Sequence, residues 1–204
     1  SDHVIDLGLF VVTVPTGVRL VGIGLEHGCR VGLDDVIDVE LDRSTADLIA
    51  LGCGDQRCEL IEVVLGGADR VEQRGDLDAR RIGLWGVSMG GYYAPRCAAM
   101  DDRFSACIAW GPIWDYHATW VKRIRALKEA ALPVPAEHLL WTCGVKTYEE
   151  ALQKLEGFKS GDIAGRVTVP FLLMHGAEDA QVSTEDANKL FAAIASGDKT
   201  MRVF

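Results

Sequence analysis

The feature that most constrains the fold is an apolar run that ends in a serine between glycines. Residues 81–91 read Arg-Ile-Gly-Leu-Trp-Gly-Val-Ser-Met-Gly-Gly, so a strand-like stretch leads into a segment of small residues. Such a run is typical of a strand that is buried on both faces of a sheet. The glycines at positions 86 and 90 around Ser88 predict a tight strand-to-helix turn, the nucleophile elbow, which holds a serine hydroxyl above the carboxyl edge of a parallel sheet.

The flanking glycines of this turn have a steric reason. The serine takes an unfavourable φ, and a side chain two positions away would collide with the neighbouring strand or helix. The turn also directs N–H groups at the start of the helix, including that of Met89, toward the position of an oxyanion. A small-residue helix over 90–100 and a strand over 105–111 complete a strand, helix, strand unit with a right-handed crossover.

Composition excludes several classes of function. The chain has 204 residues, 49% of them hydrophobic, which suits one globular domain. The formal net charge is −9 and the sequence shows no stripe of basic residues, which argues against binding of nucleic acid. No apolar run is long enough to span a membrane and no signal-peptide pattern begins the chain, so a cytoplasmic location is expected. The six cysteines lack metal-ligand spacing, and we expect buried thiols and no metal.

The N-terminal part predicts a β-hairpin. Residues 9–14 and 18–25 are rich in β-branched side chains and are separated by a Pro-Thr-Gly turn, an arrangement that commonly forms the antiparallel edge of an α/β sheet. His27 and Gly28 follow, and Gly28 is a candidate for a second oxyanion N–H; an ordinary turn with an exposed histidine is the alternative. Helical spacing of apolar residues predicts a helix over 61–71.

Residues 112–166 differ in character from the segments around them. They are rich in aromatic side chains and predict short helices over 118–131, 136–143 and 147–156. A segment inserted after a strand next to the elbow would lie across the active site as a lid, with aromatic side chains lining an apolar pocket. Most of these side chains are expected to hold the lid helices together. The three nearest the strand end, Trp114, Asp115 and Tyr116, are predicted to face the substrate.

The sheet resumes after the lid. Residues 167–175 predict a buried strand, followed by a loop that contains Asp179. A carboxylate in the loop after a late strand orients the imidazole of a Ser, Asp, His triad. Glu178 could compete for this role, but Asp179 lies at the far side of the Gly176 turn and is preferred. A helix that ends at Gly197 and a strand over 200–204 complete the pattern.

Together these pieces resemble the α/β-hydrolase superfamily, and most of all the branch of 2,6-dihydroxypseudooxynicotine hydrolase and the FrsA-like esterases. The resemblance covers residues 67–204 and is specific at residues 81–94 and at the motif His-Gly-Ala-Glu-Asp that ends at Asp179. It implies a mostly parallel, doubly wound α/β sheet, incomplete at its C-terminal end, with a core of residues 1–111 and 167–204 and a helical lid of residues 112–166. It also implies a serine hydrolase without metal or cofactor, in which Ser88 is the nucleophile and Asp179 the acid.

The catalytic histidine departs from the pattern. In the superfamily it follows the last strand, whereas that strand is only beginning at Phe204. Three interpretations stay open: the chain is cut short of its histidine, another histidine serves, or the protein is inactive. A serine without a base loses most of its nucleophilicity.

The expected function is therefore hydrolysis of an ester, or of a carbon–carbon bond beside a ketone, in a small and partly apolar substrate. An inactive ligand-binding protein of the same fold and a peptidase of the prolyl-oligopeptidase type are the alternatives. The expected partner is a small-molecule substrate, with neither nucleic acid nor membrane; a homodimer is left open.

Overall fold

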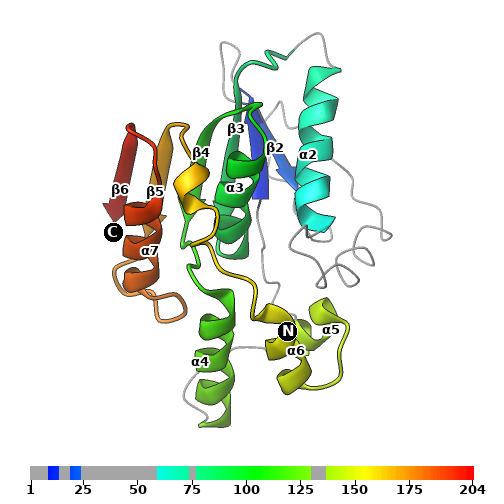
Figure 1. Ribbon diagram of the computed structural model, residues 1–204, viewed down its shortest axis with the longest axis vertical. Helices are drawn as coiled ribbons and strands as arrows, with labels where there is room; N and C mark the ends of the chain where they lie inside the picture. Colours follow the sequence, from blue (N-terminus) through cyan, green and yellow to red (C-terminus); the bar gives the residue numbers. More distant parts are fainter. Residues whose placement is uncertain (1–8, 14–18, 24–58, 74–76, 130–136) are drawn as a thin grey trace.

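The computed structural model describes residues 9–13, 19–23, 59–73, 77–129 and 137–204. Within them, a six-stranded sheet runs in the order β2-β1-β3-β4-β5-β6 (Figure 1). β3 to β6 are parallel, and β1 is antiparallel to both β2 and β3. The predicted hairpin at the antiparallel edge and the mostly parallel α/β sheet are thus confirmed. The strands are β1 (Leu9–Thr13), β2 (Arg19–Ile23), β3 (Ile82–Val87), β4 (Phe104–Trp110), β5 (Phe171–His175) and β6 (Lys199–Val203).

Two groups of helices accompany the sheet. α3 packs on β3 and β4, α2 packs on α3, and the short η1 contacts both α3 and α7, so this group covers one face. α4, α5 and α6 lie beyond the carboxyl ends of the parallel strands (Figure 1). The helices are α2 (Glu59–Glu72), α3 (Met89–Met100), α4 (Tyr116–Lys128), α5 (Glu137–Cys143), α6 (Tyr148–Leu155), the 3-10 helix η1 (Ala164–Arg166) and α7 (Thr184–Ala193).

The prediction that the elbow strand is buried on both faces holds for one face only. Along β3 fully buried residues alternate with half-buried ones, and Ile82 and Leu84 belong to the core beneath α3. The other face carries Trp85, whose ring stacks on that of Trp110 at 6.4 Å, and Trp110 is 40% exposed. Successive side chains of a strand point to opposite faces of the sheet. The apolar run therefore contributes to one buried face and to one partly exposed face that carries aromatic rings.

Some predicted boundaries are wrong for identifiable reasons. The strand predicted over 167–175 begins at Phe171, and at the predicted start the N–H of Val167 closes a turn on Ala164. The helix predicted to end at Gly197 ends at Ala193, since Ile194 is already extended at φ −61° and ψ 126°. The first helix of residues 112–166 begins at Tyr116, two residues before the predicted start.

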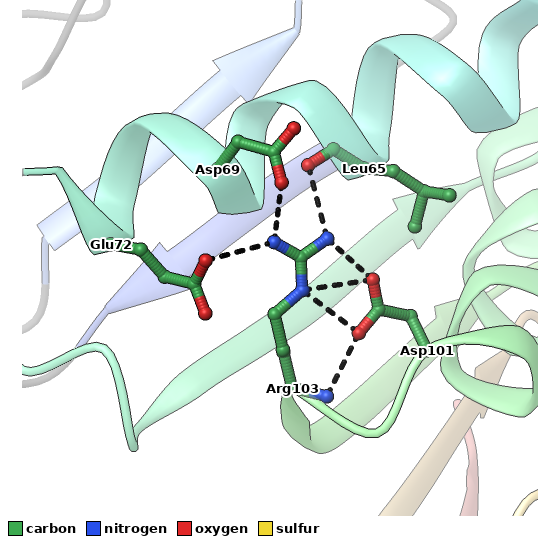
Figure 2. A network of polar contacts seen from close by, with 5 residues as sticks. All are labelled: Leu65, Asp69, Glu72, Asp101 and Arg103. Atoms are coloured by element: carbon green, nitrogen blue, oxygen red, sulfur yellow. Dashed lines mark hydrogen bonds and ion pairs between the residues drawn. The ribbon is translucent and has the colours of Figure 1, made fainter.

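Arg103, in the turn before β4, joins α2 to the sheet through a network of polar contacts (Figure 2). Its guanidinium donates to the carboxylate of Asp101 at 2.6–3.0 Å and to Asp69 and Glu72 of α2. A further N–H reaches the carbonyl oxygen of Leu65 at 3.4 Å. The hydrogen bonds from Arg103 hold the pKa of Asp101 below its ordinary value. One side chain thus fastens the helix before the elbow strand to the turn after α3.

Replacing Arg103 with methionine is expected to lower the free energy of unfolding by about 1–2 kcal/mol at neutral pH, the usual range for partly exposed hydrogen bonds to charged groups. The folded-state pKa of Asp101 lies below its unfolded value, so its contribution is present above about pH 4 and is lost as the pH falls through the folded pKa. Urea unfolding at pH 7 and pH 3 should show a smaller difference between the two proteins at pH 3. Arg80→Met is the control, because Arg80 is 90% exposed and its ion pair among the described residues is a local one with Asp78. A difference that is equal at both pH values would contradict this account.

Candidate active site

Ser88 occupies the strained turn that the sequence predicts. Its φ of 55° and ψ of −111° place it in a region that L-residues rarely adopt, and it is the one non-glycine residue with positive φ in the described part of the chain. Two backbone hydrogen bonds hold it there: its N–H donates to the Trp110 carbonyl at 2.8 Å, and its carbonyl accepts from Tyr92 at 3.3 Å. The serine therefore sits between the end of β3 and the first turn of α3.

Close backbone approach explains two glycines of this turn. A Cβ on Gly86 would lie 2.0 Å from the carbonyl oxygen of Gly90. A Cβ on Gly91 would lie 2.9 Å from the carbonyl oxygen of Trp110, at the end of the next strand. Both obstacles are backbone atoms, which cannot rotate away. The turn brings α3 against β3 and β4 only because these two positions lack side chains.

Asp179 lies in the loop that follows β5, and the backbone of that loop orients it. Its Oδ1 accepts hydrogen bonds from the N–H groups of Gln181 at 2.8 Å and Val182 at 3.0 Å. The ring of His175, fully buried at the end of β5, lies 3.2 Å from the Val182 carbonyl through Nε2. The other carboxylate oxygen, Oδ2, faces Gly111, where a Cβ would lie 3.9 Å away. The carboxylate thus has one oxygen bound to its own loop and one directed toward the end of β4.

Ser88 and Asp179 line the same hollow, at the carboxyl edge of the parallel strands. β4 separates β3 from β5 in the sheet, so the ends of these two strands flank the end of β4. The hollow has a volume of about 230 Å³. It is lined by Val87, Ser88, Trp110, Gly111, Asp179, Gln181 and Val182. A hydroxyl and a carboxylate far apart in the sequence therefore share one edge of the fold.

A comparison with protein families shows the family of this chain. The model of the prolyl oligopeptidase family matches residues 60–204, which include both Ser88 and Asp179. The chain belongs to the prolyl oligopeptidase family. The expected α/β-hydrolase fold is thereby confirmed.

Relatives of this family member include the branch that the sequence resembles. The 2,6-dihydropseudooxynicotine hydrolase of Paenarthrobacter nicotinovorans is 31% identical over 99 residues, which cover 48% of this chain and 24% of that protein. The 20-hydroxy-prefusarin hydrolase of Gibberella moniliformis is 29% identical over 161 residues, 64% of this chain and 38% of the other. A crystal structure of the 2,6-dihydroxy-pseudo-oxynicotine hydrolase matches with a TM-score of 0.60 at 23% identity, over 70% of this chain and 38% of that one. The chain spans less than half the length of each of these proteins.

None of the histidines whose side chains the structure describes lines the hollow beside Ser88 and Asp179. His175 is buried against Val182, and its Nδ1 has no hydrogen-bond partner among the described residues. His117, half-buried on α4, is not one of the residues that line the hollow. His3 and His27 lie outside the described residues, and the side chain of His138 is likewise not described. Within the described part, the hollow therefore contains a hydroxyl and a carboxylate without an imidazole.

Trp114, Asp115 and Tyr116, predicted to face the substrate, all make contacts within the fold. Asp115 caps α4, accepting from the Ala118 N–H at 2.9 Å, and none of the three lines the hollow. Trp114 packs against Gly161, and the hydroxyl of Tyr116 donates to the sulfur of Met89 at 3.0 Å. A role for these three residues in substrate binding stays a prediction.

Of the two predicted oxyanion donors, the structure describes Met89 but not Gly28. Met89 is the first residue of α3, where helix N–H groups are directed outward, but no described contact tests its role. Gly28 lies outside the described residues. The β6 end adds its own backbone to this edge, since Phe204 bonds to His175 and Ala177 at 3.0 and 2.7 Å.

The described cysteines do not compete with the serine. Cys97, Cys107 and Cys143 are buried, and burial raises the pKa of the Cys107 thiol well above its ordinary value. A protonated thiol is a poor nucleophile. No group of three or more metal-binding side chains gathers in the described part of the chain, and none of its helices could cross a bilayer.

Proposed function

We propose that the protein is a serine hydrolase in which Ser88 is the nucleophile and Asp179 orients the general base. The observation that carries this proposal is the common hollow, into which a strained helix-start serine and a loop-bound carboxylate both open. Ser88 attacks a carbonyl carbon while an imidazole takes its proton, and N–H groups near Met89 stabilise the oxyanion. Asp179 stabilises the imidazolium that forms. The histidine that supplies this imidazole is not assigned to a residue.

The substrate we propose is a small ester or a ketone cleaved at the adjacent carbon–carbon bond. Supporting observations are the size of the hollow, about 230 Å³, and the presence of Val87, Trp110 and Val182 among the residues that line it. Two relatives are named as hydrolases of small organic molecules, 2,6-dihydropseudooxynicotine and 20-hydroxy-prefusarin. Hydrolysis of a peptide bond stays the alternative. A cytoplasmic location and a homodimer stay predictions.

Labelling with a fluorophosphonate tests the nucleophile. The 204-residue chain, and the longer product if its gene continues past Phe204, should gain one adduct at Ser88 by intact mass and peptide mapping. Ser88→Ala should gain none while keeping its far-UV circular dichroism. A 4-nitrophenyl ester should be hydrolysed faster than a dipeptide 4-nitroanilide, which separates esterase from peptidase. An adduct that persists in Ser88→Ala, or none in any version of the native protein, would reject the proposal.

An inactive ligand-binding protein is the second candidate, favoured by one observation: within the described part, no imidazole lines the hollow. Catalysis would then be absent, and Ser88→Ala would leave the affinity for an apolar ligand unchanged. A large loss of affinity in that variant would exclude this alternative.

A further inference from the structure

Arg123 on α4 is a buried cation whose donors are poorly satisfied. Its side chain is 8% exposed, and its guanidinium lies over the ring of Trp120 at 5.1 Å from the centroid. Its Nε has no hydrogen-bond partner among the described residues. Nη2 reaches only the side-chain oxygen of Gln181, at 3.5 Å, the outer limit for a hydrogen bond. No carboxylate of the described residues forms an ion pair with it.

A second buried arginine shows how this fold satisfies such a group. Arg96 on α3 is 2% exposed and donates to the Lys159 carbonyl at 2.8 Å and to both carboxylate oxygens of Asp162. Arg123 has no comparable partners in the described part of the chain, although removing a cation from water is costly unless it is paired. Burial accordingly lowers the pKa of Arg123, while Tyr116 and Asp179 act in the opposite direction. Buried donors left open in a folded protein call for an explanation.

The position of Arg123 offers an explanation for its open donors. Gln181, its long-range contact, lines the hollow beside Ser88 and Asp179. The Gln181 side chain is exposed and weakly held, so a ligand can displace it at little cost. Arg123 does not itself line the hollow, but a ligand that displaced Gln181 would meet its guanidinium. This planar fork of N–H donors suits a planar, two-oxygen anion such as a carboxylate, which it can bind through two parallel hydrogen bonds.

We propose that Arg123 binds a carboxylate of the substrate, so that the hydrolase acts on small esters or ketones that carry a free acid group. This inference rests on the proposed function, since it names the substrate class of the same hollow. Arg123 on α4 then selects the substrate, while Ser88 and Asp179 at the edge of the sheet carry out the reaction. Asp179 is close enough to influence Arg123 electrostatically. The experiment must therefore distinguish direct binding of the substrate by Arg123 from an indirect effect of Arg123 on Asp179.

Two matched esters separate these roles. Mono-4-nitrophenyl glutarate carries a free carboxylate, and its methyl ester is neutral and of nearly equal shape. Arg123→Gln is expected to reduce kcat/KM for the charged ester about 30-fold relative to the neutral one, because a hydrogen-bonded charge pair is lost. Arg123→Lys should keep part of the preference. Arg125→Gln, the same charge change on an exposed residue of α4, should keep all of it. Equal losses for the two esters would overturn the proposal in favour of an effect through Asp179.

A binding measurement keeps the test independent of catalysis. In a Ser88→Ala background, glutarate titrated against tryptophan fluorescence should bind, and Arg123→Gln should weaken binding by at least about tenfold. Thermal unfolding of each variant checks that the fold is kept. If no ester is hydrolysed but glutarate binding depends on Arg123, the proposed function fails and the anion site stands. If glutarate does not bind, or binds equally well to Arg123→Gln, the anion site is rejected whatever the kinetics show.

Discussion

Gly86→Ala is expected to lower the free energy of unfolding by about 3 kcal/mol or more, and to displace the nucleophile turn. The added Cβ would lie 2.0 Å from the carbonyl oxygen of Gly90, 2.3 Å from its carbonyl carbon and 3.0 Å from the Gly91 nitrogen. All three are backbone atoms of the first turn of α3, so no side-chain rotation relieves the contact. α3 must move away from β3, and this separates well-packed core residues, which is costly in a dense interior.

Urea unfolding followed by circular dichroism measures this loss, and Gly66→Ala is the matched control. Gly66 lies within α2, and a Cβ built on it meets nothing within 4 Å. Alanine there should raise the free energy of unfolding by about 0.5–1 kcal/mol, since glycine is the weaker helix former. Equal stability changes in the two variants would show that helix propensity, and not close approach, decides the effect at Gly86.

The elbow could be predicted because its cause is local. The steric demands on Ser88 and on the glycine two residues before it involve only the chain within a few positions, and they leave a readable spacing. The position of Asp179 at the edge that holds Ser88 could be predicted for a different reason: parallel strands direct the loops that follow them to one edge, whatever their separation in sequence. The start of β5 was predicted too early, because the apolar residues from Val167 onward fit a strand as well as they fit the turn that follows η1.

Arg123 could not be predicted, because its significance depends on tertiary contacts. The sequence around it, Lys-Arg-Ile-Arg, is typical of a solvated helix face, and Arg125 two positions later is 79% exposed. Only the packing of α4 on the loop that contains Gln181 distinguishes the two arginines. Asp115 shows the same dependence on structure: its place near the strand end predicts a substrate contact, and only the structure shows that its side chain also caps α4.

Asp179→Asn is expected to reduce kcat for the hydrolysed ester about 10³–10⁴-fold, with little change in stability. Asparagine retains a carbonyl oxygen at the position of Oδ1, which can still accept from the N–H groups of Gln181 and Val182. The loop should therefore keep its conformation. The lost feature is the negative charge on Oδ2, which in the proposed mechanism stabilises an imidazolium and fixes its tautomer. Steady-state kinetics and urea unfolding on the same preparations give both quantities.

Glu178→Gln is the matched control, because Glu178 is the adjacent exposed carboxylate and the competing candidate for the acid. It removes the same charge one residue away, so it should leave kcat within about threefold, as expected for a screened surface charge. Loss of activity in Glu178→Gln with retention in Asp179→Asn would transfer the acid role to Glu178. Comparable losses in both would mean that the net charge of the loop, and not one directed carboxylate, supports the reaction; this would contradict the assignment of Asp179.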